Sequence, residues 1–148
     1  MSGRLPAELS VGFEEIDGQH RFLLRDLETA RAAAEQSDLA AVKVALPALA
    51  DAFVSHFASE ESLMAESGYP DRAKHKGAHD LFMQEVAQIS QELATLGLTP
   101  GVREGLMIRV PEWTRFHIQV NDAPLGRFLA ARRQRPHPAP GRDKPYVS

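Results

Sequence analysis

The chain reads VKVALPALADAFVSHFASEESL from residue 42 to residue 63. In this stretch apolar residues recur at alternating steps of four and three, the period of an amphipathic helix that packs against other helices. Two positions on the apolar seam are instead a histidine and a glutamate, His56 and Glu60. An imidazole and a carboxylate in a hydrophobic core are costly unless something binds them. The stretch therefore predicts a core helix that carries ligands.

Three further stretches have the same periodicity, and short breaks containing Gly, Pro or Ser separate the four. The first helix is expected from about residue 16 to residue 35. Ser37 is the expected N-cap of the second helix, and Thr99 that of the fourth. Nothing shows the alternation of a β-strand. Four helices of roughly 20–30 residues with short connections predict an all-α fold, an antiparallel up-down-up-down four-helix bundle.

Prolines interrupt this pattern in several places. Pro47 and Pro111 fall inside the second and fourth predicted helices, where each should kink or restart the helix. Residues 132–148 contain four prolines and five of the 17 basic residues, and they lack periodicity. We therefore expect a bundle domain over residues 1–131 and a flexible Pro/Arg-rich tail over residues 132–148.

Composition excludes several classes of protein. The 148 residues carry a net charge of −3, which favours neither nucleic-acid binding nor attraction to a membrane. Cysteine is absent, so disulfides, thiolate sites and iron–sulfur clusters are excluded. The N-terminal residues lack the apolar run of a signal peptide, and no segment approaches the length of a transmembrane helix. The sequence thus predicts a cytoplasmic protein.

Seven candidate metal ligands lie on the four predicted helices: His20, His56, Glu60, His75, His79, His117 and Asp122. They fall near the start of the first and third helices and near the end of the second and fourth. In an antiparallel bundle these positions share one level. Imidazole suits iron, zinc, copper or nickel, and seven donors exceed what a single ion would use. Five imidazoles and two bridging carboxylates fit a pair of ions.

The pair His117 and Asp122 requires a distortion of the fourth helix. At about 3.6 residues per turn, a spacing of five places the two residues about 140° apart. Pro124 would supply the distortion, because its ring clashes with the carbonyl group of Val120 and it lacks an N–H. We expect a local bulge or kink there that turns Asp122 inward.

Each of these signals has an ordinary explanation when it stands alone. A histidine and a glutamate four residues apart are usually a solvated surface pair, and a single histidine is usually a satisfied core or surface residue. The hypothesis of a metal site depends on the conjunction. Every pair falls on the apolar seam of its own helix, and all four helices contribute.

Several runs of the sequence resemble the hemerythrins, particularly the bacterial ones, over roughly residues 9–131: Val11-Gly12-Phe13, Ile16-Asp17-x-x-His20, His56-Phe57-x-x-Glu60-Glu61-x-x-Met64, Gly68-Tyr69-Pro70, His75-x-x-x-His79 and His117-Ile118-x-x-x-Asp122-x-x-Leu125-Gly126. The resemblance implies two non-haem iron ions per chain, with one held by His75, His79 and His117. His20 and His56 would hold the other. Glu60 and Asp122 would bridge the pair together with an oxo or hydroxo group.

The chain departs from the family pattern in three places. Bacterial relatives usually carry a tryptophan shortly before the Val-Gly run, whereas the only tryptophan here is Trp113. Thr114 and Phe116 stand beside the ligand positions of the fourth helix, where aliphatic residues would be ordinary. Pro111 and the basic tail are also unexpected. None of these differences removes a ligand.

The resemblance implies reversible O2 binding at the iron with two histidines, whose remaining position is open. Imidazoles outnumber carboxylates five to two, unlike the carboxylate-rich di-iron bundles that activate oxygen, and Phe57, Leu23, Leu24, Phe82 and Trp113 predict an apolar surround. We therefore expect an O2 carrier, store or buffer and not an enzyme. Two alternatives stay open: an O2 or redox sensor that binds a protein partner through the tail, and a di-iron enzyme acting on peroxide or NO.

Overall fold

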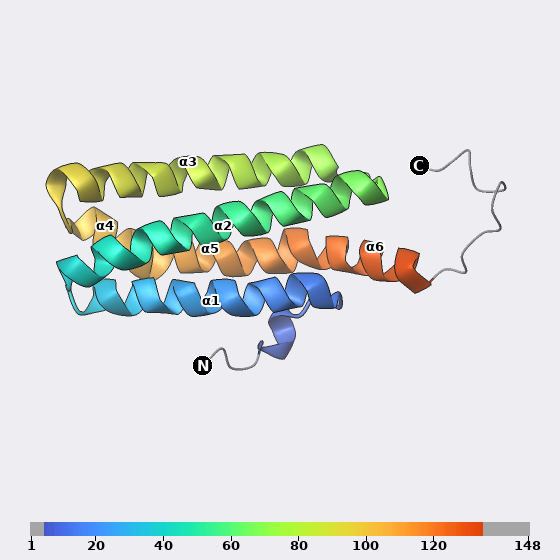
Figure 1. Cartoon of the computed structure of the whole chain (residues 1–148), viewed down its shortest axis with the longest axis horizontal. Helices are drawn as coiled ribbons and strands as arrows, with labels where there is room; N and C mark the ends of the chain where they lie inside the picture. Colours follow the sequence, from blue (N-terminus) through green and yellow to red (C-terminus); the bar gives the residue numbers. More distant parts are fainter. Residues whose placement is uncertain (1–4, 135–148) are drawn as a thin grey trace.

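A computed structural model describes residues 5–134, which form a bundle of four antiparallel rods (Figure 1). Three rods are single helices: α1 (Glu14–Glu35), α2 (Leu39–Ser67) and α3 (Arg72–Leu96). The fourth rod consists of α4 (Pro100–Glu104), α5 (Val110–His117) and α6 (Ala123–Gln134), joined by two π-helical segments. A 3₁₀ turn, Ala7–Leu9, precedes α1. The predicted all-α four-helix bundle is confirmed.

The ends of the helices follow from local side chains. Thr99 caps α4 as predicted, because its hydroxyl accepts the N–H of Val102 at 3.1 Å. The prediction that Ser37 caps α2 is wrong. Ser37 has a φ of 53°, and the extended residue after it, Asp38, is the cap, accepting the N–H of Ala41 at 3.1 Å. An N-cap residue has an extended backbone, whereas the positive φ of Ser37 turns the chain between α1 and α2, so the next residue becomes the cap.

Each of two prolines on the fourth rod follows a π-helical segment. Pro111 comes two residues after the segment Gly105–Arg109, and Pro124 two residues after the segment Ile118–Asp122. The residue before each proline donates its N–H to the carbonyl five positions back. Proline itself has no N–H and crowds the carbonyl four positions back, so the wider turn relieves the conflict.

The prolines therefore differ in their effects. The predicted distortion at Pro124 is confirmed, and α5 restarts at Val110, next to Pro111, as predicted. Pro47, by contrast, lies inside α2, which continues from Leu39 to Ser67. The restart that the sequence suggested for Pro47 does not occur.

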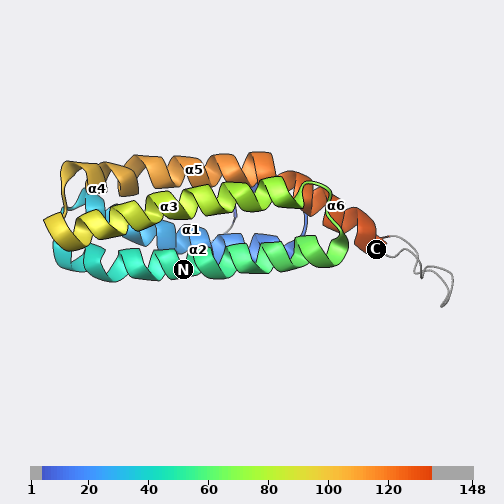
Figure 2. The ribbon, with the colours of Figure 1, turned by 90° about the horizontal axis from the view of Figure 1, so that it is seen from above.

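The core contains two apolar clusters, and the predicted ligands lie between them along the rods. The larger cluster includes Leu23, Leu27, Leu49, Phe53, Phe57, Phe82, Val86, Ile89 and Leu106. The smaller cluster includes Leu9, Val11, Phe13, Ile16, Met64, Ile118, Leu125 and Leu129. On α1, for example, His20 falls between Ile16 and Leu23. The polar residues thus occupy one level between two hydrophobic layers. The helices of the bundle run side by side (Figure 2).

The segment before α1 is fastened to the ligand end of the bundle. The buried carboxylate of Asp17 accepts hydrogen bonds from the Ser10 hydroxyl at 2.7 Å and from the Val11 N–H at 2.8 Å. At Gly126 on α6, a Cβ atom would lie 2.2 Å from the Val11 carbonyl oxygen. Only glycine allows this approach, so the segment packs directly on the backbone of α6.

The expectation that no segment approaches the length of a transmembrane helix is wrong for α2, which is long and apolar enough to cross a membrane by length and composition alone. Its inner side, however, forms the bundle core: Val42, Leu46, Leu49 and Phe53 are each at most 2% exposed. Packing against the other rods thus accounts for the apolar residues on this side of α2, whereas Val44 and Val54 on the same helix are exposed.

The predicted tail falls mostly outside the described residues. Residues 132–134 belong to α6 (Ala123–Gln134). Residues 135–148 are not described, so the domain boundary at residue 131 and the flexible tail stay predictions.

Candidate metal centre

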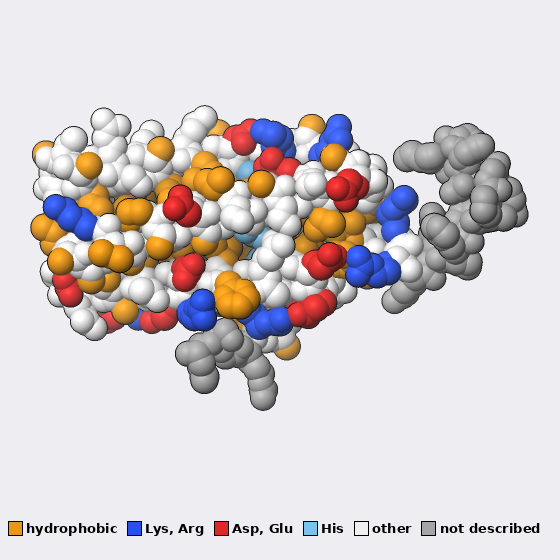
Figure 3. Space-filling view, viewed as in Figure 1, with side chains coloured by type: hydrophobic (Ala, Val, Ile, Leu, Met, Phe, Trp, Pro, Cys, Tyr) orange, Lys and Arg blue, Asp and Glu red, His pale blue; other side chains and the backbone are white. Residues whose placement is uncertain are grey.

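The seven predicted ligands converge and are all buried, none more than 5% exposed. Little histidine surface is visible on the face shown in Figure 3. Their donor atoms fall into two overlapping groups, in each of which all atoms lie within 4.8 Å of one another. The three-histidine group comprises His75, His79, His117, Glu60 and Asp122. The two-histidine group comprises His20, His56, Glu60 and Asp122.

The two carboxylates belong to both groups, and each directs one oxygen to each group. Glu60 Oε1 lies 3.2 Å from His75 Nε2, whereas Glu60 Oε2 lies 3.2 Å from His56 Nε2. Asp122 Oδ1 lies 3.0 Å from His75 Nε2, whereas Asp122 Oδ2 lies 2.9 Å from His20 Nε2. A carboxylate that divides its oxygens in this way has the arrangement needed to bridge two cations.

The imidazoles face the same point through equivalent atoms. The Nε2 atoms of His20 and His56 lie 3.1 Å apart, and those of His79 and His117 lie 3.2 Å apart. His75 directs its Nε2 at both carboxylates. Neutral imidazoles that approach through a lone pair repel one another, so this convergence favours protons or cations at the centre.

Asp122 reaches the centre because the helix changes its pitch before it. The segment Ile118–Asp122 is π-helical, and the extra residue in this turn brings positions five apart toward one side. Asp122 Oδ1 consequently lies 3.2 Å from His117 Nε2, and the aspartate is completely buried. The predicted inward turn of Asp122 is therefore confirmed.

Unsatisfied polar atoms show that the residues fit a pair of cations. Both oxygens of Asp122 and Oε2 of Glu60 are buried and lack a well-aligned hydrogen-bond partner, although imidazole nitrogens lie within 4 Å. Buried carboxylate oxygens without partners are costly. Metal ions at the two groups would satisfy these oxygens and the converging nitrogens together.

Without metal ions, the two carboxylates of the centre pair with protonated imidazoles. Burial and the Asp122 charge raise the pKa of Glu60, but the attraction and hydrogen bonds of His56 and His75 outweigh them, and this pKa falls to about 2. Burial also opposes ionisation of Asp122, whose pKa is nevertheless held well below its ordinary value by three imidazoles whose Nε2 atoms lie within 3.2 Å of its oxygens. Burial lowers the pKa of His75, yet hydrogen bonds to both carboxylates raise it to about 9. Protons and cations therefore compete for the same atoms.

Two side chains that the sequence did not single out as partners hold the ligands from behind. Glu61 Oε2 lies 2.9 Å from His79 Nδ1, and Gln19 Oε1 lies 2.7 Å from His56 Nδ1. Such partners fix the ring orientation and the tautomer of a ligating histidine. Gln19 is adjacent in sequence to the predicted ligand His20, and Glu61 follows Glu60 within the run that resembles the hemerythrins, but neither signal showed which histidine it would contact.

Aromatic rings cover the three-histidine group. Phe57 stacks on His79 with ring centroids 3.9 Å apart and planes at 9°. Trp113 stacks on His117 at 4.5 Å and on Phe82 at 3.8 Å. The predicted apolar surround is confirmed for these rings.

Thr114 and Phe116, two residues of α5 that depart from the family pattern, have different environments. Thr114 is buried and donates its hydroxyl to the Val110 carbonyl at 2.8 Å, so its polar atom is satisfied within the helix. Phe116 is 60% exposed and takes no part in the centre.

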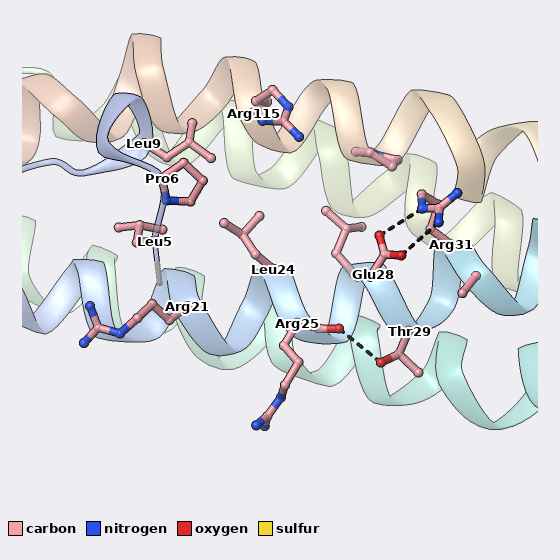
Figure 4. A pocket seen from close by; sticks show the side chains of 13 residues that line it. Leu5, Pro6, Leu9, Arg21, Leu24, Arg25, Glu28, Thr29, Arg31 and Arg115 are labelled. Carbon is pink, nitrogen blue, oxygen red and sulfur yellow. Dashed lines mark hydrogen bonds and ion pairs between the residues drawn. The ribbon is translucent and has the colours of Figure 1, made fainter. Parts of the chain in front are cut away.

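A cavity of about 700 Å³ lies elsewhere, in a groove between α1 and the fourth rod (Figure 4). Pro6 and Leu9 form one end of it, and Arg115 faces Leu24 across it. None of the seven predicted ligands lines this groove. It is therefore separate from the candidate metal centre.

Comparison with known proteins agrees with this geometry. The model of the hemerythrin HHE cation binding domain family matches residues 11–128. A bacteriohemerythrin of Stenotrophomonas maltophilia (strain R551-3) is 37% identical over 99 residues, which are 60% of this chain and 65% of that protein. The chain thus spans less than two thirds of that relative's length. A bacteriohemerythrin of Pseudomonas paraeruginosa (strain DSM 24068 / PA7) is 30% identical over 116 residues, covering 78% of this chain and 74% of that protein.

The fold gives the same answer. The crystal structure of wild-type hemerythrin matches with a TM-score of 0.76 and 25% sequence identity, covering 86% of this chain and 97% of that one. The residues matched by the family model include all seven candidate ligands. The chain therefore belongs to the hemerythrin family and is bacteriohemerythrin-like.

Proposed function

We propose that this chain binds two non-haem iron ions and uses them to bind O2 reversibly. His75, His79 and His117 would hold one iron, and His20 and His56 the other. Glu60 and Asp122 would bridge them, together with an oxo or hydroxo group. The observation that carries the proposal is the division of both carboxylates, each with one oxygen toward each histidine group.

The unequal donor groups support a position for O2. Five protein residues supply the three-histidine group and four supply the two-histidine group. With equal coordination numbers, the ion in the smaller group keeps one more position for an external molecule. When bound, the iron pair supplies the redox chemistry for holding O2, which members of this family bind.

The surrounding residues suit binding better than catalysis. Imidazoles outnumber carboxylates in the centre, which limits the anionic charge that stabilises highly oxidised iron. Phe57 lies beside rings of both groups, with its ring centroid 3.9 Å from that of His79 and 5.9 Å from that of His56, and makes the surroundings of the centre apolar. Water and protons would promote loss of bound oxygen, so these apolar surroundings favour reversibility. We therefore also propose that the protein is an O2-binding protein and not an enzyme, and that it is located in the cytoplasm.

An O2 titration followed by visible absorbance tests the proposal. The reduced, iron-loaded full-length chain should develop an absorption band with O2 and lose it when O2 is removed, over repeated cycles. His56→Ala should abolish the band, because the O2-binding ion loses a ligand. Turnover of peroxide or NO without a reversible band would contradict the proposal and support the enzyme alternative.

A further inference from the structure

Two ligand imidazoles have side-chain partners of different charge behind them. His79 Nδ1 lies 2.9 Å from a carboxylate oxygen of Glu61. His56 Nδ1 lies 2.7 Å from the amide oxygen of Gln19. With a metal ion on Nε2 of each ring, Nδ1 carries the proton and donates a hydrogen bond to the partner oxygen. One ring in each histidine group is thus held from behind, by an anion in one group and a neutral amide in the other.

The neutral partner is fixed in its orientation. The Gln19 amide nitrogen donates to the Ser59 hydroxyl at 2.9 Å, which leaves the amide oxygen for His56. Nδ1 of His20, the other imidazole of this group, is buried without a hydrogen-bond partner in the described part of the chain. The two-histidine group therefore has no anionic side chain on an Nδ1 atom within residues 5–134.

The carboxylate partner, Glu61, forms an ion pair with His79 and also acts through its charge on Lys76. The Glu61 side chain is 29% exposed, so it retains contact with water while its oxygen reaches the buried ring. Within the described residues, the ion pair that Glu61 forms is the one with His79. Lys76, on the neighbouring helix α3, pairs with Asp80 at 2.9 Å instead.

A carboxylate and an amide act differently on a ligating imidazole. A hydrogen bond to an ionised acceptor is about twice as strong as one between neutral groups. It draws the Nδ1 proton away and makes Nε2 a stronger electron donor. A stronger donor stabilises iron(III) relative to iron(II), and so lowers the reduction potential of the ion it holds.

We propose that Glu61 is a positioning residue that makes the iron of the three-histidine group the easier of the two to oxidise. The inference rests on the proposed di-iron site. In the step concerned one iron(II) becomes iron(III), and the electron passes to an external one-electron oxidant such as ferricyanide, which becomes ferrocyanide. The ion at the two-histidine group stays reduced, beside the position assigned to O2.

Glu61→Gln separates the charge from the orientation. Glutamine still offers an oxygen to His79 Nδ1, so the ring stays in place while the negative charge is lost. In an anaerobic redox titration of the iron-loaded chain, the equilibrium constant for the first one-electron oxidation should fall about tenfold, which is a rise of about 59 mV in potential. The second oxidation should shift much less.

Two variants complete the test. Glu66→Gln removes a charge from the exposed surface of the same helix, away from the ligands, and should leave both steps unchanged. Gln19→Glu places the charge behind His56 and should lower the potential of the second step. An unchanged first step in Glu61→Gln, or an equal shift in Glu66→Gln, would overturn the proposal.

Iron content, measured on every sample, keeps the two proposals apart. A wild-type chain with two irons and an unshifted Glu61→Gln variant would overturn the role of Glu61 and leave the di-iron site standing. A wild-type chain that fails to hold two irons would overturn both.

Discussion

The two π-helical segments of the fourth rod share a backbone form and differ in what they position. Gly105–Arg109 and Ile118–Asp122 have the same length, and each ends two residues before a proline. The last residue of the first, Arg109, lies at the surface and pairs with Glu85 at 3.0 Å. The last residue of the second, Asp122, is fully buried among histidines.

The comparison shows that the same backbone form has two uses. Gly105–Arg109 only accommodates a proline, whereas Ile118–Asp122 also positions a candidate ligand. Both segments accommodate a proline in a long helix. Only the second turns a carboxylate into the core, where a regular helix would direct it elsewhere. The local backbone therefore sets the direction of the side chain, and the residue type at the end of the segment sets its chemistry.

The largest effect is expected from Asp122→Ala. It removes a bridging carboxylate and leaves His20 without its nearest partner, so iron content should fall from two ions per chain to one or fewer. Arg109→Ala changes the equivalent residue of the other segment. Its ion pair with Glu85 is half-exposed and contributes little to stability, so the free energy of unfolding should shift by about 0.5 kcal/mol or less. Metal analysis and thermal melting check both variants, and a full iron complement in Asp122→Ala would break the comparison.

Metal removal should also act on the two segments unequally. Ions that bind the folded chain stabilise it, so the apo-protein should melt roughly 10 °C lower than the iron-loaded protein. Hydrogen exchange should quicken in Ile118–Asp122 and change little in Gly105–Arg109. Equal melting temperatures, or equal changes in the two segments, would argue against a metal-stabilised ligand segment.

A smaller effect is expected from replacing each proline by alanine. Pro124→Ala allows a regular α-helical turn to re-form, and this turn rotates Asp122 away from the centre. Because a bridging carboxylate is lost, the more weakly bound of the two irons should be held about tenfold more weakly. Pro111→Ala relaxes the segment that carries no ligand and should leave metal affinity unchanged. Chelator competition measures both affinities. Identical affinities would mean that the proline does not maintain the position of Asp122.

The smallest effect is a dependence of apo-protein stability on pH. The pKa of His75 is raised to about 9 in the folded state from 6.5, so protonation of this ring stabilises the fold. That contribution is complete below pH 6.5 and is lost as the pH rises to about 9. Melting temperature of the apo-protein should therefore fall over this range, whereas iron-loaded protein should change less. A flat apo profile would contradict the charge pairing.

Much of the fold and the site could be predicted because periodicity and chemistry coincide. A histidine on an apolar seam is visible in sequence, since it occupies a position that packing would give to a leucine. His56 and Glu60 show this on α2, and His75 and His79 show it on α3. Asp122 could be placed because Pro124 offered a physical reason for a distorted turn.

Other features depend on contacts between distant residues and left no periodic signal. Glu61 and Gln19 resemble ordinary solvated residues on amphipathic helices until helix packing brings them behind His79 and His56. The first π-helical segment was also missed, because Pro111 indicates a disturbed helix without saying which backbone form absorbs it.

Iron stoichiometry of the anaerobically reconstituted full-length chain, determined by mass spectrometry against protein concentration, tests the central claim most directly. Convergence of five imidazoles and two shared carboxylates predicts two irons per chain in the wild type, with the same value in His137→Ala, whose histidine lies outside the seven. A single ion per chain, or none, would contradict a dinuclear centre.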